Sequence, residues 1–242
     1  MKLYRWLLLL LAVIGVYAHA QQSADYQEAL AETADMSSTE SFTDQQRRSM
    51  AQLAANCGDW PKVFELIYPL AERGDANAQA NLGILYVQGK GVAQDAEKAY
   101  WWFSEAAEQG NIKGINYLAF LYLDGFGIQK NIAHGIKLLK KTAQAGNQTA
   151  MFILGVLYYR DLQDFKNAFI WFEKAANTDH NESKFRLATM YEEGKGIKKN
   201  EQKAIYWYRE TLKHPDQFAE QAQQRLNALK SHDINPTNMD NK

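Results

Sequence analysis

The sequence predicts an all-α protein, a solenoid of stacked antiparallel helix pairs. Two observations predict it. A pattern of about a dozen residues recurs at spacings of 36, 36 and 33 residues, and each copy holds two amphipathic helical segments joined by a turn. One such pair cannot bury its apolar face alone, whereas stacked pairs share a continuous core. With 46% hydrophobic residues in a chain of 242, there is enough apolar surface for that core.

The first 20 residues have the features of a secretory signal peptide. Lys2 and Arg5 precede an apolar run over residues 6–17, and a small-x-small site follows at residues 18–20. Because the run is shorter than the roughly 20 residues that span a bilayer, we expect cleavage after Ala20 rather than a retained anchor. The mature chain is then not inserted in a membrane, and its expected location is periplasmic or secreted.

The rest of the chain divides by composition and repeat register. Residues 21–42 are polar and predict a flexible leader. A divergent helix pair is expected at residues 43–74, before four full repeats at 75–110, 111–146, 147–179 and 180–213. Residues 214–231 carry one apolar stripe and predict a capping helix, and residues 232–242 predict a disordered tail.

The first helix of each repeat is marked by a Leu, a small residue directly after it, and a Tyr four residues after the Leu. Leu and Tyr at this spacing share one helix face, and the small residue lets a neighbouring helix approach closely. The columns are Leu82, Leu118, Leu154 and Leu187; Gly83, Ala119, Gly155 and Ala188; and Tyr86, Tyr122, Tyr158 and Tyr191.

The second helix of each repeat follows an Asp or Asn that can accept a backbone N–H as the N-cap. These candidate caps are Asp95, Asn131, Asp164 and Asn200. Small and large residues then alternate on one helical face, which predicts a buried side. A Gly followed by Asp or Asn, at residues 74–75, 110–111 and 146–147, predicts the end of one helix and the cap of the next.

A Gly-x-Gly sequence, such as Gly89-Lys90-Gly91, separates the two helices in three of the repeats. A phosphate-binding loop follows a strand and opens a helix. Here the glycines follow a helix, and the third repeat keeps its cap and both helices without them. The pattern therefore predicts a turn rather than a phosphate site. The role of its middle residue, which is Lys90, Phe126 or Lys195, is left open.

Together these columns, A-x-x-x-L-G-x-x-Y-x-x-G-x-G-V/I-x-x-D/N-x-x-K-A-x-x-W-F/Y-x-x-A-A-x-x-G, resemble the Sel1-like repeat, a relative of the tetratricopeptide repeat, over about residues 58–213. The resemblance implies a right-handed superhelix whose first helices line a concave surface. It also implies a bacterial protein that acts as an adaptor, often secreted or periplasmic. A cysteine-rich branch of the family is credited with β-lactam binding or hydrolysis, but that activity is not implied for this chain, whose single cysteine is Cys57.

Nothing in the sequence indicates catalysis, a metal site or a cofactor. The histidines past the signal peptide lie in separate segments, without the paired spacing of metal ligands. Acidic neighbours such as Glu192 and Glu193 are better explained as solvated charges than as an acid and base pair. The balance of 27 Lys and Arg against 28 Asp and Glu gives no field that attracts nucleic acid. We expect a protein that is not an enzyme.

A protein-binding surface is the remaining candidate. In the geometry of tetratricopeptide repeats, side chains two before, two after and five after each consensus Leu face a groove that takes a protein or peptide partner. In the last three repeats these are Asn116, Phe120, Leu123, Phe152, Val156, Tyr159, Phe185, Thr189 and Glu192. Such an apolar and aromatic stripe favours an interface if it is exposed. The alternative is that these side chains fill the space between successive first helices.

The expected function is that of a non-enzymatic adaptor or scaffold of the bacterial envelope, which binds a partner segment along this groove. Two alternatives stay open. One is an envelope enzyme or a binder of cell-wall ligands such as peptidoglycan or β-lactams. The other is a secreted factor that engages a host protein, because the same signal peptide serves both destinations.

Overall fold

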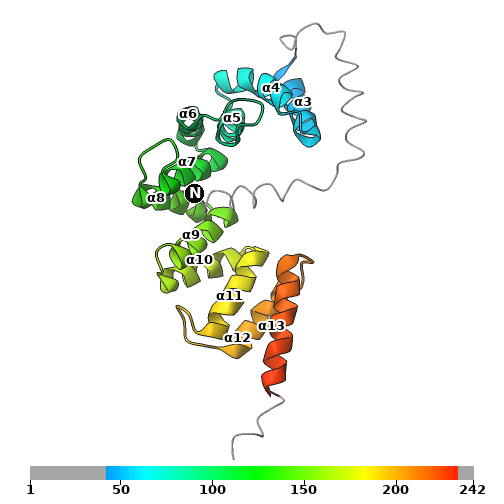
Figure 1. Ribbon diagram of the computed structural model, residues 1–242, viewed down its shortest axis with the longest axis vertical. Coiled ribbons are helices and arrows are strands. Elements are labelled where there is room, and N and C mark those ends of the chain that lie inside the picture. Colours follow the sequence, from blue (N-terminus) through cyan, green and yellow to red (C-terminus); the bar gives the residue numbers. More distant parts are fainter. Residues whose placement is uncertain (1–41, 234–242) are drawn as a thin grey trace, which may run out of the picture. The chain divides into compact units, whose positions relative to one another are not determined.

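The computed structural model describes residues 42–233, and within this range the chain is all α-helical, with eleven helices and no strand (Figure 1). The expected signal peptide, the leader up to residue 41 and the tail from residue 234 lie outside the described residues. Phe42, expected to end the leader, instead belongs to the core, where its side chain is buried. The last helix reaches Asp233, past the expected end at residue 231. The predicted α-solenoid of helix pairs is confirmed.

The helices, labelled as in Figure 1, have the following bounds: α3 Asp44–Cys57, α4 Trp60–Glu72, α5 Ala76–Gln88, α6 Ala96–Glu108, α7 Ile112–Asp124, α8 Ile132–Gln144, α9 Gln148–Arg160, α10 Phe165–Asn177, α11 Asn181–Glu193, α12 Glu201–Thr211 and α13 Gln217–Asp233. The helices α3 and α4 are the divergent pair, α5 to α12 are the four repeats, and α13 is the capping helix.

The chain divides within α8 into two compact units, unit 1 up to Leu138 and unit 2 from Leu139. In unit 1, α3 packs on α4 and α5 packs on α6, while α4 contacts α5 and α6 contacts α7. In unit 2, the pairs α9–α10 and α11–α12 are joined through α10 and α11, and α13 packs on α11 and α12. Within each unit, successive helix pairs therefore bury apolar faces against one another.

Where the small residue after the consensus Leu is a glycine, an aromatic ring on the second helix explains it. A Cβ added to Gly83 of α5 would lie 2.5 Å from the Phe103 ring of α6. The same relation recurs in unit 2, where a Cβ on Gly155 would lie 2.6 Å from the Phe172 ring. Because both phenylalanines are almost fully buried, only a residue without a side chain lets the two helices come this close.

Side-chain N-caps begin the helices as the columns predict. Asp95, Asn131, Asp164 and Asn200 each accept the backbone N–H three residues ahead at the start of a second helix. The first helices α5, α7 and α9 begin in the same way at Asp75, Asn111 and Asn147. For α11 the cap is His180, which the sequence reading did not assign.

The Gly-x-Gly segments are turns, as expected. Their first glycines, at positions 89, 125 and 194, follow α5, α7 and α11 with φ between 65° and 80°. The second glycine of each turn lies against the first residue of the second helix in the preceding helix pair. A Cβ on Gly127 would lie 2.3 Å from the Cβ of Ala96, and one on Gly196 would lie 2.1 Å from the carbonyl oxygen of Phe165. The turn of one repeat therefore packs closely against the preceding repeat.

Where it is a lysine, the middle residue of the turn also contacts the first residue of the preceding second helix. The Lys90 ammonium lies 4.3 Å from the centre of the Trp60 ring, and the Lys195 ammonium lies 4.6 Å from that of Phe165. Phe126 is partly buried against the core of unit 1. In the third repeat, which lacks the glycines, Gln163 takes the left-handed conformation with φ of 51°.

Candidate protein-binding surface

The first helix of the first repeat, α5, exposes one narrow line of side chains. Past its first residue, α5 leaves only Asn77, Asn81, Ile84 and Gln88 accessible to solvent. These lie four, three and four residues apart, which places them on one helical face. Asn77 and Asn81 lie five residues and one residue before the consensus Leu82, and Ile84 and Gln88 lie two and six residues after it. The exposed line is therefore polar at its ends, with one apolar side chain near the middle.

The next first helix of unit 1, α7, repeats this line with Lys113, Phe120 and Asp124. The fourth position is Tyr117, which is buried and meets the Phe120 ring edge-on, with ring centres 6.0 Å apart. We call the accessible residues at these four positions of α5 and α7 the unit-1 stripe: Asn77, Asn81, Ile84, Gln88, Lys113, Phe120 and Asp124.

Hydrogen bonds tie the two lines of the unit-1 stripe together. The Lys113 ammonium donates to the Asn81 side-chain oxygen at 2.7 Å. One turn nearer the helix starts, the Asn111 amide donates to the Asn77 oxygen at 2.8 Å. The Lys113 side chain is accessible, yet desolvation by the surrounding protein lowers the pKa of its ammonium group. A cation and several amides are thus held side by side on one surface.

Unit 2 presents the same positions with different chemistry. We call the accessible residues at these positions the unit-2 stripe: Thr149, Val156 and Arg160 on α9, and Arg186, Thr189 and Glu193 on α11. Arg186 is bonded to the buried Glu182 at 2.9 Å, and the Thr189 hydroxyl donates to the carbonyl of Arg186 at 2.7 Å. Burial raises the pKa of Glu182, and the bond from Arg186 acts against that rise. The unit-2 stripe is therefore more charged than the unit-1 stripe.

Of the nine predicted groove residues, the structure buries four. Asn116, Leu123, Phe152 and Phe185 each expose 8% or less. For these four, the expectation that the side chains are accessible is wrong, because neighbouring helices cover them. Leu123, for example, lies where a Cβ on Gly135 of α8 would be only 2.7 Å from its Cγ. These four side chains instead fill space between helices, which was the alternative prediction.

The two buried phenylalanines of unit 2 illustrate this packing. Phe152 of α9 lies between the Phe172 ring, 6.1 Å away, and the His180 ring, 4.6 Å away. Phe185 of α11 packs on Tyr208 at 5.7 Å and on Phe218 at 6.0 Å between ring centres. Both rings hold successive helix pairs together.

Two further predicted residues, Tyr159 and Glu192, are partly exposed but have partners within unit 2. The Tyr159 hydroxyl accepts a hydrogen bond from the Lys195 ammonium at 3.0 Å, and this bond raises the pKa of that ammonium group. Glu192 accepts a bond from the Tyr208 hydroxyl and lies 3.5 Å from the Arg225 guanidinium. Burial, and then the bond to Glu192, raise the pKa of Tyr208.

The three remaining predicted residues, Phe120, Val156 and Thr189, lie on the stripes as accessible side chains. Binding by any of the nine stays a prediction. The residues that the sequence reading missed are the polar members of the stripes, such as Asn77, Asn81 and Lys113. A signal was present, because polar residues four apart at the start of α5 mark its solvent face.

Unit 1 also has a shallow hollow of about 500 Å³, lined by Tyr100, Tyr122 and residues 128–131. The Tyr100 and Tyr122 hydroxyl oxygens are 3.3 Å apart, and their bond raises the pKa of Tyr122. The lining holds no carboxylate and no histidine.

Within residues 42–233, no three His, Cys, Asp or Glu side chains converge to hold a metal ion. Over the same stretch, no helix combines the length and the apolar character needed to cross a bilayer.

The packed helix pairs define an α-solenoid repeat protein. The Sel1 repeat model matches residues 76–111, 112–147, 148–180 and 181–212. The chain therefore belongs to the Sel1 repeat family, whose proteins generally mediate protein–protein interactions and typically are not catalysts. No curated protein sequence matches the chain in a direct comparison.

Solved structures with this fold are similar to the chain. A Sel1 repeat protein from Oxalobacter formigenes is 25% identical with a TM-score of 0.60, over 76% of this chain and 58% of that one. A protective antigen of uropathogenic Escherichia coli with the same repeat fold is 30% identical with a TM-score of 0.62, over 79% and 44%. The chain thus spans about half the length of these two proteins. A Klebsiella pneumoniae protein described as a Sel1 repeat protein, 22% identical with a TM-score of 0.51 over 77% and 93%, shares the fold.

Proposed function

We propose that this protein is a non-enzymatic adaptor of the bacterial envelope that binds an extended segment of a partner protein on its exposed stripes. The observation that carries the proposal is the unit-1 stripe. There, the apolar side chains Ile84 and Phe120 lie on two neighbouring helices that are tied together by the Lys113–Asn81 bond.

The chemistry of the unit-1 stripe suits a peptide backbone. An extended segment presents N–H and C=O groups along its length, and Asn and Gln side chains both donate and accept hydrogen bonds. Asn77, Asn81 and Gln88 supply such groups around Ile84. From residue 77 to residue 88 the stripe is about 16 Å long, which matches about five residues of extended chain. Apolar side chains of the partner would be buried on Ile84 and Phe120, and Lys113 favours an acidic residue there.

A photo-crosslinking residue at position 84 tests this proposal in cells. We expect one protein to crosslink from position 84 and the crosslink to be lost with Phe120→Ser. Trp101→Ser is the matched control, because Trp101 is 51% exposed on α6, outside the stripe. The proposal fails if Trp101→Ser removes the crosslink as strongly as Phe120→Ser, or if position 84 gives no specific crosslink.

Export is the second part of the proposal, and it rests on the signal-peptide pattern of residues 1–20. Cell fractionation and N-terminal sequencing test it, with a mature chain that begins at Gln21 and occurs in the periplasm or the medium as the expected result. A full-length chain in the cytoplasm would contradict it.

A further inference from the structure

The start of α11 differs from that of the other first helices. Where α5, α7 and α9 are capped by Asp75, Asn111 and Asn147, α11 is capped by a histidine. The His180 Nδ1 accepts the Ser183 backbone N–H at 3.2 Å and lies 2.9 Å from the Ser183 hydroxyl oxygen. Nδ1 can accept the backbone N–H only in the neutral ring, with the proton on Nε2. The cap therefore exists in one protonation state only.

Two elements enclose the His180 ring. On the α9 side it stacks on Phe152 with ring centres 4.6 Å apart and planes 26° apart. On the α13 side, Asp216 is the nearby acidic group, and it accepts a bond from the Asn181 amide at 2.9 Å. Burial lowers the pKa of His180, and the charge of Asp216 opposes this effect without cancelling it.

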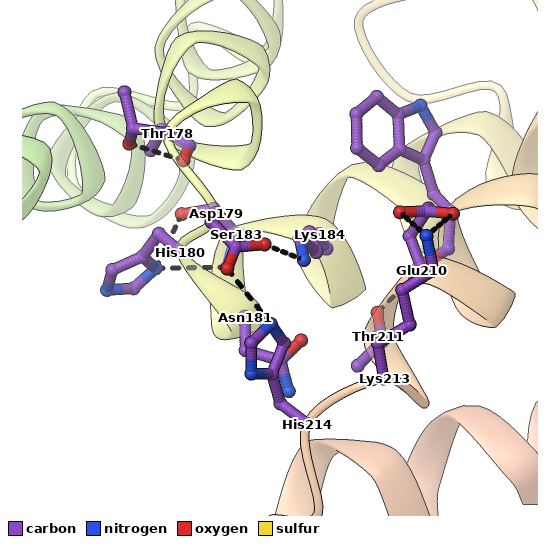
Figure 2. A network of polar contacts seen from close by, with 12 residues as sticks. Thr178, Asp179, His180, Asn181, Ser183, Lys184, Glu210, Thr211, Lys213 and His214 are labelled. Atoms are coloured by element: carbon purple, nitrogen blue, oxygen red, sulfur yellow. Dashed lines mark hydrogen bonds and ion pairs between the residues drawn. The ribbon is translucent and has the colours of Figure 1, made fainter.

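The other charged groups at the corner between α10 and α11 are already paired. Asp179, in the left-handed conformation with φ of 70°, is bonded to Lys184 and lies 3.0 Å from the His214 Nε2 (Figure 2). The bonds from Lys184 and then His214 lower the pKa of Asp179. Glu182 is paired with Arg186. The hydrogen bonds of His180 Nδ1 are with the Ser183 backbone N–H and the Ser183 hydroxyl.

We propose that the corner between α10 and α11 is a pH-sensitive joint, in which protonation of His180 in mildly acidic solution releases the first turn of α11. A proton from solvent binds Nδ1, and the bond from the Ser183 N–H is lost. The imidazolium then lies at the positive end of the α11 dipole, which is unfavourable. Because α11 carries part of the unit-2 stripe, acid would also alter that surface. This last consequence rests on the proposed function, whereas the joint itself does not.

Hydrogen exchange on the full mature chain tests the joint without any partner. Protection factors of the Ser183 and Lys184 amides, which remove the intrinsic pH dependence of exchange, are compared at pH 7.5 and pH 5.0. We expect a fall of up to about 30-fold, the limit set by an ordinary histidine pKa of about 6.5 if the folded ring stays neutral. The first turn of α5, which is capped by Asp75, should change less than about twofold over this range.

His180→Asn is the matched variant, because Asn is the cap of α7 and α9 and does not titrate. We expect it to keep the protection of α11 constant between the two pH values. His214→Gln and Glu182→Gln each remove another ionisable group close to the start of α11, and both variants should behave like the unchanged chain. The proposal is overturned if His180→Asn shows the same fall, or if either control variant abolishes it.

An NMR titration of the histidine rings in the unchanged chain gives an independent result, should His180→Asn fail to fold. The His180 ring is expected to titrate below the ordinary histidine range. A pKa at or above about 6.5 would overturn the proposal.

Discussion

The backbone of Gly91 lies directly against the carbonyl oxygen of Trp60, so that a Cβ at position 91 would be 2.2 Å from that oxygen. Gly91 also has a φ of 70°, a conformation that residues with side chains rarely adopt. Two independent reasons therefore favour glycine at position 91. Its backbone is left-handed, and the start of α4 leaves no space for a Cβ.

Gly91→Ala should therefore destabilise unit 1 by about 2–4 kcal/mol, the sum of a left-handed backbone penalty and a forced separation from α4. Gly110→Ala is the control, because Gly110 has φ of 79° but no atom within 4 Å of an added Cβ. It should cost only about 1 kcal/mol. Urea unfolding followed by circular dichroism measures both, and equal losses would contradict the contact with Trp60.

Phe152→Ala and Phe185→Ala should each cost about 3–5 kcal/mol, because each ring fills the space between helix pairs of unit 2. Phe120→Ala should cost less, about 1 kcal/mol, because its ring is partly exposed. Denaturant midpoints of the three variants give the comparison. A loss for Phe120→Ala as large as that for Phe152→Ala would show that the exposed stripe has been misplaced.

Asp75 should make the fold sensitive to acid. Burial alone would raise the pKa of its carboxyl group, but the bond from the Ala78 N–H and the ion pair with Arg48 at 2.7 Å lower it below the ordinary 3.8. A carboxyl group with a lowered pKa in the folded state adds stability above its unfolded pKa, and that stability is lost as the pH falls through the folded value.

Asp75→Asn keeps a cap but does not titrate, so the variant should lose less stability than the unchanged chain between pH 5 and pH 2. Thermal melts across this range measure the difference. Parallel curves for the two proteins would mean that other carboxyl groups cause the acid sensitivity.

Tyr208→Phe should destabilise unit 2 by about 1–3 kcal/mol, because the Tyr208 hydroxyl is buried and donates to the Glu192 carboxylate. Tyr206→Phe is the control on the same helix, since Tyr206 is 55% exposed, and it should change stability by less than about 0.5 kcal/mol. Chemical denaturation of both variants at pH 7 tests this. No loss for Tyr208→Phe would mean that water replaces the hydroxyl at Glu192.

Much of the fold could be predicted from short-range patterns. The caps Asp95 and Asn131 were predictable because N-capping depends on residues three apart in sequence. The turns were predictable because a left-handed glycine ends α5, α7 and α11 in the same column. The fold class followed from these local features repeated at a fixed period.

The binding surface was harder to place. Taking the groove positions from a related repeat put Phe152 and Phe185 on the surface, whereas rings from neighbouring elements bury them. Contacts between separate helices of this kind are not reported by any local sequence pattern. The polar spacing of Asn77 and Asn81 was the better guide, because it depends only on which face of α5 meets water.

His180 was missed for a different reason. The repeat register places Asp179 in the column of the closing glycine and His180 in the column of the cap, so the position was available from the sequence. Histidine is not among the residues usually found at an N-cap, which are Asp, Asn, Ser and Thr, so the residue type does not indicate a cap at this position.

The contact between the second turn glycine and the preceding second helix has a consequence for rearranged versions of this chain. The turn of one repeat fits the start of the helix that precedes it, as Gly196 fits Phe165. Repeats are therefore not interchangeable modules whose borders lie at the ends of helix pairs. A chimera or a circular permutant should keep each turn together with the helix on which it rests. The segment to exchange therefore begins at the second helix of one repeat and ends after the turn of the next repeat.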